Sequence, residues 1–336
     1  MRRALFAATV FVVVSSQALA WSDAGHKIVA SIAFARLTPK EREKVVEILR
    51  EHPRFKADFL DELPADVADS DRNEWLFQQA AVWPDIARAF KGDDRRYNHS
   101  TWHYINVPQY LSPGDEKALQ GKLKVNIALD PPAQPIEEMN AIQTIRLARS
   151  MLVDDTVSKS DKAIMLAWLF RLVGGIHQPL QSTALFSQKL FPDGDRGGNL
   201  IKTKQRGNLH ALWDGFPGGK ATLREAHQDA LKLMADVDLA RVGDRDGATL
   251  DEKDWLDESW KMARDFAYAP LLPTLRDMEM EGGDIQQITL QEDYLLRGRA
   301  LSKLRLVMAG YRLAAVLSQS VDRSQAARDD RPGGAS

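Results

Sequence analysis

Apolar residues recur every three or four positions along most of the chain, and long stretches that alternate apolar with polar residues are missing. This spacing is typical of helices that bury one face, whereas strands alternate at every second position. The segment that follows Gly25 shows it clearly, with Ile28, Val29 and Ile32 on one predicted helix face. The pattern therefore predicts an all-α fold, a single domain of many helices.

The same pattern sets the expected helix boundaries. Thr38 and Pro39 are typical of an N-cap and a first helical position. We expect helices over residues 25–37, 40–51, 72–80, 84–90, 136–152, 159–173, 223–234, 254–267 and 293–317.

Two long irregular segments, 92–132 and 181–207, are rich in Pro, Gly and Asp. Irregular segments of this length in a compact domain usually carry function. The polar tail 318–336 is expected to be disordered. We therefore expect one helical domain over residues 21–317.

The chain begins with the features of a signal peptide. Two arginines at positions 2 and 3 precede an apolar run over residues 4–14, which is too short to span a membrane, and Ala18-Leu19-Ala20 is a typical cleavage site. Cleavage after Ala20 would export the protein to the periplasm or the medium. It would also leave Trp21 as a free N-terminus, either as a metal-chelating end or as an ordinary first residue.

Composition narrows the partners of the chain. Cysteine is absent, so an exported form has to rely on a packed core and has no disulfides. The formal net charge is −2, which excludes the strongly basic surface of many nucleic-acid-binding proteins. A phosphate substrate would have to be attracted by local positive charge, from bound cations or from a few arginines.

Candidate metal ligands are scattered along the chain. His210 and Asp214 are four residues apart, so they share one helix face and could chelate a cation, although such a pair is also a common surface ion pair. Asp85 and His103 add a second acid and a second imidazole. Each also has an ordinary explanation, because Asp85 could pair with Arg88 and His103 could be a half-buried histidine.

Taken in order, these segments resemble the three-zinc, single-strand-specific nucleases of the S-one and P-one type, relatives of zinc-dependent phospholipase C. The resemblance covers nearly the whole chain after residue 20. It rests on Trp21 with Gly25-His26, Trp83-x-Asp85-x-x-Arg88, His103-Tyr104-Ile105, His177-Gln178-Pro179-Leu180, Gly194-Asp195-Arg196-Gly197-Gly198-Asn199, Asn208-Leu209-His210-x-x-Trp213-Asp214 and Ala309-Gly310-Tyr311-Arg312-Leu313-Ala314.

This resemblance implies a set of site residues. The implied zinc ligands are Trp21, His26, Asp85, His103, His210 and Asp214. Asp85 and Arg88 would be catalytic, and Arg88, Asn199 and Tyr104 would contact substrate. Bases would stack on exposed aromatic side chains, for which Trp21, Trp102 and Tyr104 are candidates, although aromatic residues are more often part of the core.

The chain departs from the family in one segment. Relatives typically read His-x-x-x-Asp, followed six residues later by a His that closes Gln-Pro-Leu-His. Arg171, Gly175 and Gln181 occupy those three ligand positions here, and these residues bind zinc poorly or not at all. Fewer than three zinc ions are therefore expected. His177 is retained, but it is not a ligand in the family.

Arg171 lies within an apolar stretch, where an unpaired guanidinium would be costly. We therefore expect an ion pair with Asp85, in which the charge of a side chain replaces that of a metal. The alternative is that Arg171 reaches solvent from the edge of its helix.

The resemblance favours an exported, zinc-dependent hydrolase that cleaves single-stranded DNA or RNA to 5′-phosphates. The three replaced ligands leave a second possibility open: an impaired relative that binds nucleotides, nucleic acid or another partner without hydrolysis. Phospholipase C chemistry is a further alternative. It is opposed by the short gap from Trp21 to His26, by Asp rather than Glu at position 214, and by the lack of a membrane-docking stretch.

Overall fold

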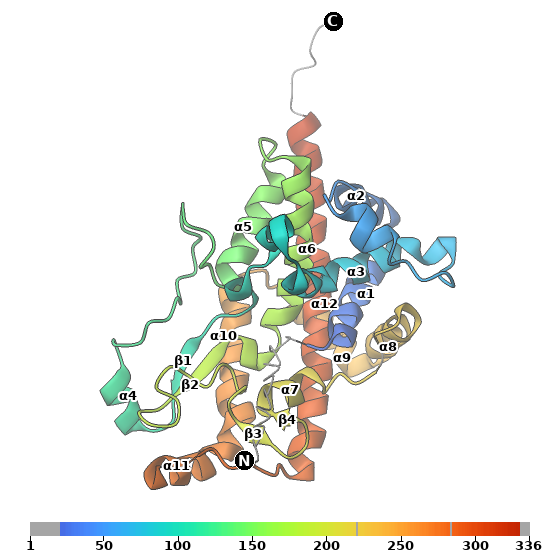
Figure 1. Cartoon of the computed structure of the whole chain (residues 1–336). Coiled ribbons are helices and arrows are strands. Elements are labelled where there is room, and N and C mark those ends of the chain that lie inside the picture. The colour runs from blue at the N-terminus through green and yellow to red at the C-terminus, as the bar shows by residue number, and fades with distance from the viewer. Residues whose placement is uncertain (1–20, 220, 283, 330–336) are drawn as a thin grey trace, which may run out of the picture.

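The computed structural model describes residues 21–219, 221–282 and 284–329, with side chains described through Asp322. The predicted signal peptide and its cleavage site lie outside these residues. The long C-terminal helix α12 runs through the middle of the molecule, with α5 and α6 on one side and α1, α2 and α3 on the other (Figure 1). The expectation of an all-α, multi-helix fold is confirmed.

The α-helices are α1 (Asp23–Arg36), α2 (Pro39–Arg50), α3 (Arg72–Ile86), α4 (Pro113–Leu119), α5 (Ala141–Val153), α6 (Lys159–Ile176), α7 (Leu209–Asp214), α8 (Leu223–Ala235), α9 (Val237–Asp246), α10 (Glu252–Met262), α11 (Leu272–Glu281) and α12 (Glu292–Asp329). Shorter helical turns are η1 (Phe55–Leu60), η2 (Asp69–Asp71), η3 (Ala87–Ala89), η4 (Gly92–Tyr97), η5 (Ser100–His103), η6 (Pro179–Gln181), η7 (Ala263–Tyr268) and η8 (Ala269–Leu271).

Strands are few and short in the described part of the chain. β1 (Val107–Tyr110) pairs in parallel with β2 (Thr183–Phe186), and β3 (Lys202–Thr203) pairs antiparallel with β4 (Gly207–Asn208). The first pair joins the two long irregular segments of the sequence, because β1 belongs to one and β2 to the other. It thereby holds the residues that follow α6 beside those that follow η5.

Helix α6 forms the centre of the main core. Every residue from Met165 to Ile176 is buried, because α6 is packed by α2, α3, α5 and α12. A helix buried all round reads as continuously apolar, and one charged residue, Arg171, interrupts this stretch. A guanidinium is therefore placed in the interior and has to find its partners there.

Local signals explain several helix boundaries. Thr38 caps α2 through a capping box with Glu41, and Pro39 begins the helix as predicted. Asn140 forms a second capping box with Gln143, so α5 begins at Ala141, later than the expected residue 136. Side-chain caps such as these supply partners for the unpaired N–H groups of the first helical turn.

Other boundaries differ from expectation for tertiary reasons. Segments 72–80 and 84–90 were expected as two helices, but α3 is continuous through Pro84, with its residues from Glu74 to Pro84 buried. Helix α12 continues beyond the expected end at Leu317, and its Val321 is still buried. It reaches into the segment expected to be a disordered tail, of which residues 330–336 lie outside the described chain.

Helices α4, α7, α9 and α11 are not among the expected helices. They are only 6 to 10 residues long, so each offers few positions in which a periodic pattern can be recognised. In the described residues no helix combines the length and the apolar character that crossing a membrane would require.

Helix α1 packs closely on α12 at Gly310. A Cβ added there would lie 2.5 Å from both Cβ and Cγ2 of Ile32, far inside van der Waals contact. We predict that Gly310→Ala lowers the free energy of unfolding by about 1 to 3 kcal/mol, because the two helices must separate. Urea unfolding measures this.

The matched control is Gly114→Ala in α4, where the nearest contact of the new Cβ would be an ordinary 3.5 Å. An equal effect of the two alanines on stability would contradict the close packing at Gly310.

His52 packs against the core at the end of α2. Its ring lies edge-on to Trp83 with centroids 4.3 Å apart, and its Nδ1 accepts a hydrogen bond from the backbone N–H of Arg54. Burial lowers the pKa of His52 to about 4, and the nearby Asp58 only partly offsets this. The imidazole is therefore neutral in the folded protein at pH values where it is protonated in the unfolded chain.

We predict that His52 makes the folded protein less stable as the pH becomes acidic. The unfolded chain binds the extra proton below its ordinary pKa of about 6.5, so stability falls as the pH drops from about 6.5 to about 4 and then levels, by about 3 kcal/mol in total. In His52→Asn, an amide oxygen can accept the Arg54 hydrogen bond without titrating. Denaturant unfolding at each pH should show a shallower decline for this variant, and parallel curves would contradict the assignment.

Candidate functional site

The N-terminal end of α1 meets α6 and α7. The Trp21 indole N–H donates to the carbonyl oxygen of Gly174 at 3.0 Å, and the backbone N–H of Ser22 donates to the carbonyl oxygen of Asp214 at 3.0 Å. Trp21 is completely buried. Residues from the start of the described chain are thereby placed beside the last turns of two helices far away in sequence.

His26 lies one turn into α1 and is fully buried. Neither ring nitrogen has a hydrogen-bond partner among the described residues. The ring packs on Gly174, where an added Cβ would come within 2.9 Å of its Nδ1. A side chain at position 174 would therefore displace the imidazole.

Asp85 and Arg171 form the ion pair that the sequence predicts. The guanidinium Nε donates to Asp85 Oδ2 at 2.5 Å, and Nη2 donates to Oδ1 at 3.4 Å. The Arg171 side chain is 0% exposed, so the alternative in which it reaches solvent is wrong. Arg88 adds a second guanidinium, with its Nε 3.0 Å from Asp85 Oδ1. One carboxylate thus faces two permanent cations.

Burial and these cations set the protonation of the group. Burial by itself raises the pKa of Asp85, but Arg171 and Arg88 outweigh it, so the pKa lies below its ordinary value. Burial, reinforced by the charge of Arg171, lowers the pKa of both His26 and His103 well below the ordinary range. Both imidazoles are therefore neutral near pH 7.

His103 ends the turn η5 and is buried against the edge of Trp168, with ring centroids 4.9 Å apart. Its Nδ1 is 3.7 Å from Asp85 Oδ1, too far for a hydrogen bond, and both ring nitrogens lack partners among the described residues. His103 precedes β1, which begins at Val107, and at 2% exposed it is buried where the ordinary explanation had a half-buried histidine. His103 nevertheless faces the same carboxylate as Arg171.

His210 and Asp214 lie on the short helix α7, with Nε2 and Oδ2 3.6 Å apart. His210 Nδ1 donates to the carbonyl oxygen of Gly197 at 2.6 Å, which leaves Nε2 as the acceptor. The Gln181 amide nitrogen donates to that Nε2 at 2.8 Å. The Nε2 lone pair of His210, which would otherwise bind a metal, therefore accepts a hydrogen bond from Gln181. Gln181 is itself one of the three residues at replaced ligand positions.

Gln178 completes this group, although sequence reasoning does not single it out. Its amide nitrogen donates to Asp214 Oδ1 at 2.8 Å, while its own oxygen accepts from the backbone N–H of Leu180. Burial raises the pKa of Asp214 to about 6, with His210 and Gln178 opposing it. The only signal in the sequence for Gln178 is its place in the phrase with His177, Pro179 and Leu180.

The predicted substrate contacts separate into exposed and buried residues. Tyr104 is 38% exposed, whereas Trp21 and Trp102 are buried in the core, so only Tyr104 of the three aromatic candidates offers a surface for stacking. Asn199 is partly exposed, and its amide nitrogen donates to the carbonyl oxygen of Arg196. It follows the loop that carries Gly197, the partner of His210.

Asp195 holds the loop of Gly197 and Asn199 in place. Its carboxylate accepts from the backbone N–H groups of Leu185 and Gly198 and from the Tyr268 hydroxyl. This buried carboxylate therefore fixes the loop through hydrogen bonds from three donors.

His177 has a structural partner set. Its Nδ1 donates to the carbonyl oxygen of Val173, and its Nε2 accepts from Arg312 Nη1 at 2.8 Å. Arg312 also forms two hydrogen bonds with Glu258. Both ring nitrogens are therefore used in packing α6 against α10 and α12.

The residues present do not fit a three-zinc cluster. Gly175 supplies no carboxylate, Gln181 presents an amide N–H to His210, and Arg171 puts a cation on the acid that would bind metal. Among the described residues no three His, Asp or Glu side chains are grouped so that they could hold a metal ion. The fit fails because of charge as well as ligand number.

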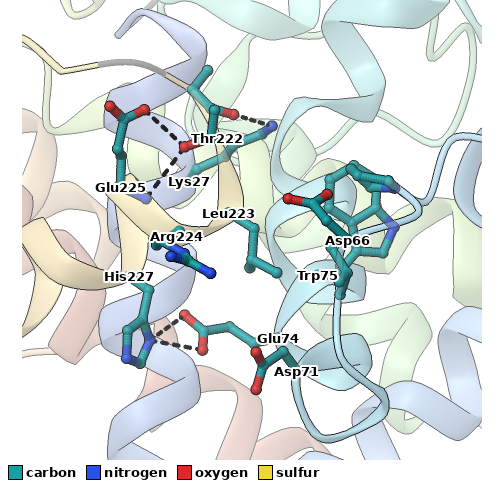
Figure 2. A pocket seen from close by; sticks show the side chains of 13 residues that line it. Lys27, Asp66, Asp71, Glu74, Trp75, Thr222, Leu223, Arg224, Glu225 and His227 are labelled. Atoms are coloured by element: carbon teal, nitrogen blue, oxygen red, sulfur yellow. Dashed lines mark hydrogen bonds and ion pairs between the residues drawn. The ribbon is translucent and has the colours of Figure 1, made fainter.

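A separate pocket of 740 Å³ lies between α1, α3 and α8 (Figure 2). The buried polar groups of its floor are paired: Lys27 donates to the carbonyl oxygen of Ala221 and lies over the Trp75 ring, while Glu74 pairs with His227. None of the residues identified above lines this pocket. The Lys27 ammonium and the Glu74 carboxylate therefore already have partners within the protein.

We predict that Asp85→Ala lowers the free energy of unfolding by about 3 to 5 kcal/mol, because Arg171 would keep a buried charge without a carboxylate. The double variant Asp85→Leu/Arg171→Met removes both charges and should lose much less. Asp61→Ala, which breaks the exposed pair with Lys56, is the control and should change stability by less than about 1 kcal/mol. A double variant as unstable as the single one would contradict this account.

Comparison with known proteins gives one family match. No curated protein matches the chain in sequence. The sequence profile of the family described as S1/P1 Nuclease matches residues 21–322. The match includes every predicted site residue and the whole described helical core, and it begins at Trp21. From this match we conclude that the chain belongs to the S1/P1 nuclease family, whose members are in general zinc-dependent enzymes acting on nucleic acid.

Proposed function

We propose that this chain is an exported member of the family that binds single-stranded nucleic acid or nucleotides without hydrolysing them by three-zinc chemistry. The observation that carries the proposal is the buried ion pair between Arg171 and Asp85. A carboxylate bound to a guanidinium at 2.5 Å is not free to bind zinc, and a metal ion beside Arg171 would be repelled.

The predicted site residues support binding better than catalysis. Zinc catalysis of this kind needs metal ions to generate hydroxide and to stabilise the leaving oxygen. Trp21, His26, His103, His210 and Asp214 remain as potential ligands, but Gly175 supplies no carboxylate at the ligand position that it occupies. Arg88, Asn199 and Tyr104 are retained, and these contact substrate in the proposed site.

Export is part of the same proposal. The leader over residues 1–20 and the family match that begins at Trp21 both support removal of the signal peptide, after which Trp21 would carry the N-terminus. Mass spectrometry of the chain recovered from the exporting host identifies its first residue.

The alternative is an active zinc endonuclease that releases 5′-phosphates. His210 favours it, because the imidazole keeps an Nδ1 hydrogen bond to a backbone carbonyl, which is a typical support for a metal-binding histidine. The Gln181 amide would then have to turn and present its oxygen.

We predict that the purified chain binds single-stranded DNA without cleaving it and carries fewer than three zinc ions per molecule. The triple variant Arg171→His/Gly175→Asp/Gln181→His restores the family ligands and should gain both zinc and cleavage. Zinc content by plasma mass spectrometry and release of 5′-phosphorylated products from labelled DNA are the measurements.

A variant that restores Gln181→His alone is the control, because the Arg171 and Asp85 pair persists in it and cleavage should remain absent. Three zinc ions and robust cleavage in the unmodified chain would refute the proposal and establish the alternative.

A further inference from the structure

The group around Asp85 leaves hydrogen-bond donors without acceptors. Arg171 Nη1 is buried and has no partner among the described residues, although Nε and Nη2 of the same guanidinium bind Asp85. Both ring nitrogens of His26 and of His103 are also unpartnered. A buried guanidinium N–H without an acceptor is costly, so this arrangement is suited to a ligand that brings acceptor oxygens.

The charges around the group favour an anion. Arg171 and Arg88 provide two permanent positive charges against the single carboxylate of Asp85. Asp23 and Asp214 also interact electrostatically with Arg171. Asp23 also faces the ammonium of Lys27, and Asp214 accepts a hydrogen bond from Gln178.

Arg171 and Arg88 therefore outnumber the one carboxylate, Asp85, that both guanidiniums contact.

The burial of the two arginines determines which kind of phosphate group can bind them. The Arg171 side chain is 0% exposed, whereas that of Arg88 is 14% exposed, so Arg88 lies nearer the surface. Tyr104 interacts electrostatically with Arg88 and is partly exposed beside it. An anion that reaches Arg171 would have to pass Arg88, and an internal phosphodiester carries nucleotides on both sides. We therefore expect a terminal phosphate, which carries a nucleotide on one side only.

We propose that Arg171 and Arg88 hold a terminal phosphate of a nucleotide or oligonucleotide in the position that the family gives to zinc. This inference rests on the proposed function and names the part of the ligand that is recognised. Arg171 Nη1 donates from the interior and Arg88 from nearer the surface, while the unpartnered rings of His26 and His103 can each donate one N–H. Tyr104 is placed to stack on the attached base. In this proposal, the position at which the family binds zinc cations binds an anion in this chain.

Equilibrium binding tests the inference with the full chain as it is recovered after export. The probes are internally labelled hexathymidylates with a 5′-phosphate, a 3′-phosphate or neither, and inorganic phosphate serves as competitor. EDTA is present so that no metal contributes. We expect at least one phosphorylated end to bind about tenfold or more tightly than the unphosphorylated probe, because charge-assisted hydrogen bonds are lost without it. Inorganic phosphate should remove that advantage.

Two variants separate recognition from folding. Arg88→Gln changes a residue nearer the surface, and Asp85→Asn/Arg171→Gln removes both charges of the buried pair together. Each should abolish the preference for a phosphorylated end. The matched control is Arg241→Gln, on an exposed arginine of α9 that pairs with Asp238.

Equal affinity for all three probes in the presence of EDTA would overturn the inference, as would a preference that survives in the double variant. Cleavage of the probes when zinc is supplied would instead refute the proposed function, so the two failures are distinguishable.

Discussion

The buried ion pair between Asp85 and Arg171 is the constraint on which the site depends. These residues are 86 positions apart in sequence and join α3 to the middle of α6 inside the core. Removing either partner alone would strand a charge among apolar side chains, whereas removing both would not. The pair therefore ties the chemistry of the site to the stability of the fold, and neither residue can change independently.

The charge of Arg171 reaches the other groups of the site. It lowers the pKa of His26 and His103 together with burial, and it acts on Asp23 and Asp214 as well. In a metal cluster, cations would hold these imidazoles and carboxylates together. Here one fixed guanidinium provides part of that positive charge, and it offers hydrogen-bond donors where a metal would offer vacant coordination positions. This difference changes which ligands the same scaffold can accept.

The interior contains a second arginine cluster, in which the buried guanidiniums have hydrogen-bond acceptors within the protein. Arg305 and Arg312 on α12 share the carboxylate of Glu258, and Arg305 also donates to Ser259 and to the carbonyl oxygen of His177. The ring of His177 is fixed by this cluster. Its donors are distributed over a carboxylate, a hydroxyl and backbone carbonyls, in contrast to Arg171, whose Nη1 finds no acceptor in the described chain.

Apolar periodicity, the Thr38-Pro39 cap and the order of the motifs determined the helical class, most of the long helices and the family, because these signals are local in sequence. The replacement of ligands at Arg171, Gly175 and Gln181 was also visible, as was the need for a buried arginine to find an acid. Tertiary structure decided the continuity of α3 through Pro84, the hydrogen bond from Gln181 to His210, and the role of Gln178. These features depend on which distant side chains meet and on how deeply each is buried, and no spacing along a chain records either.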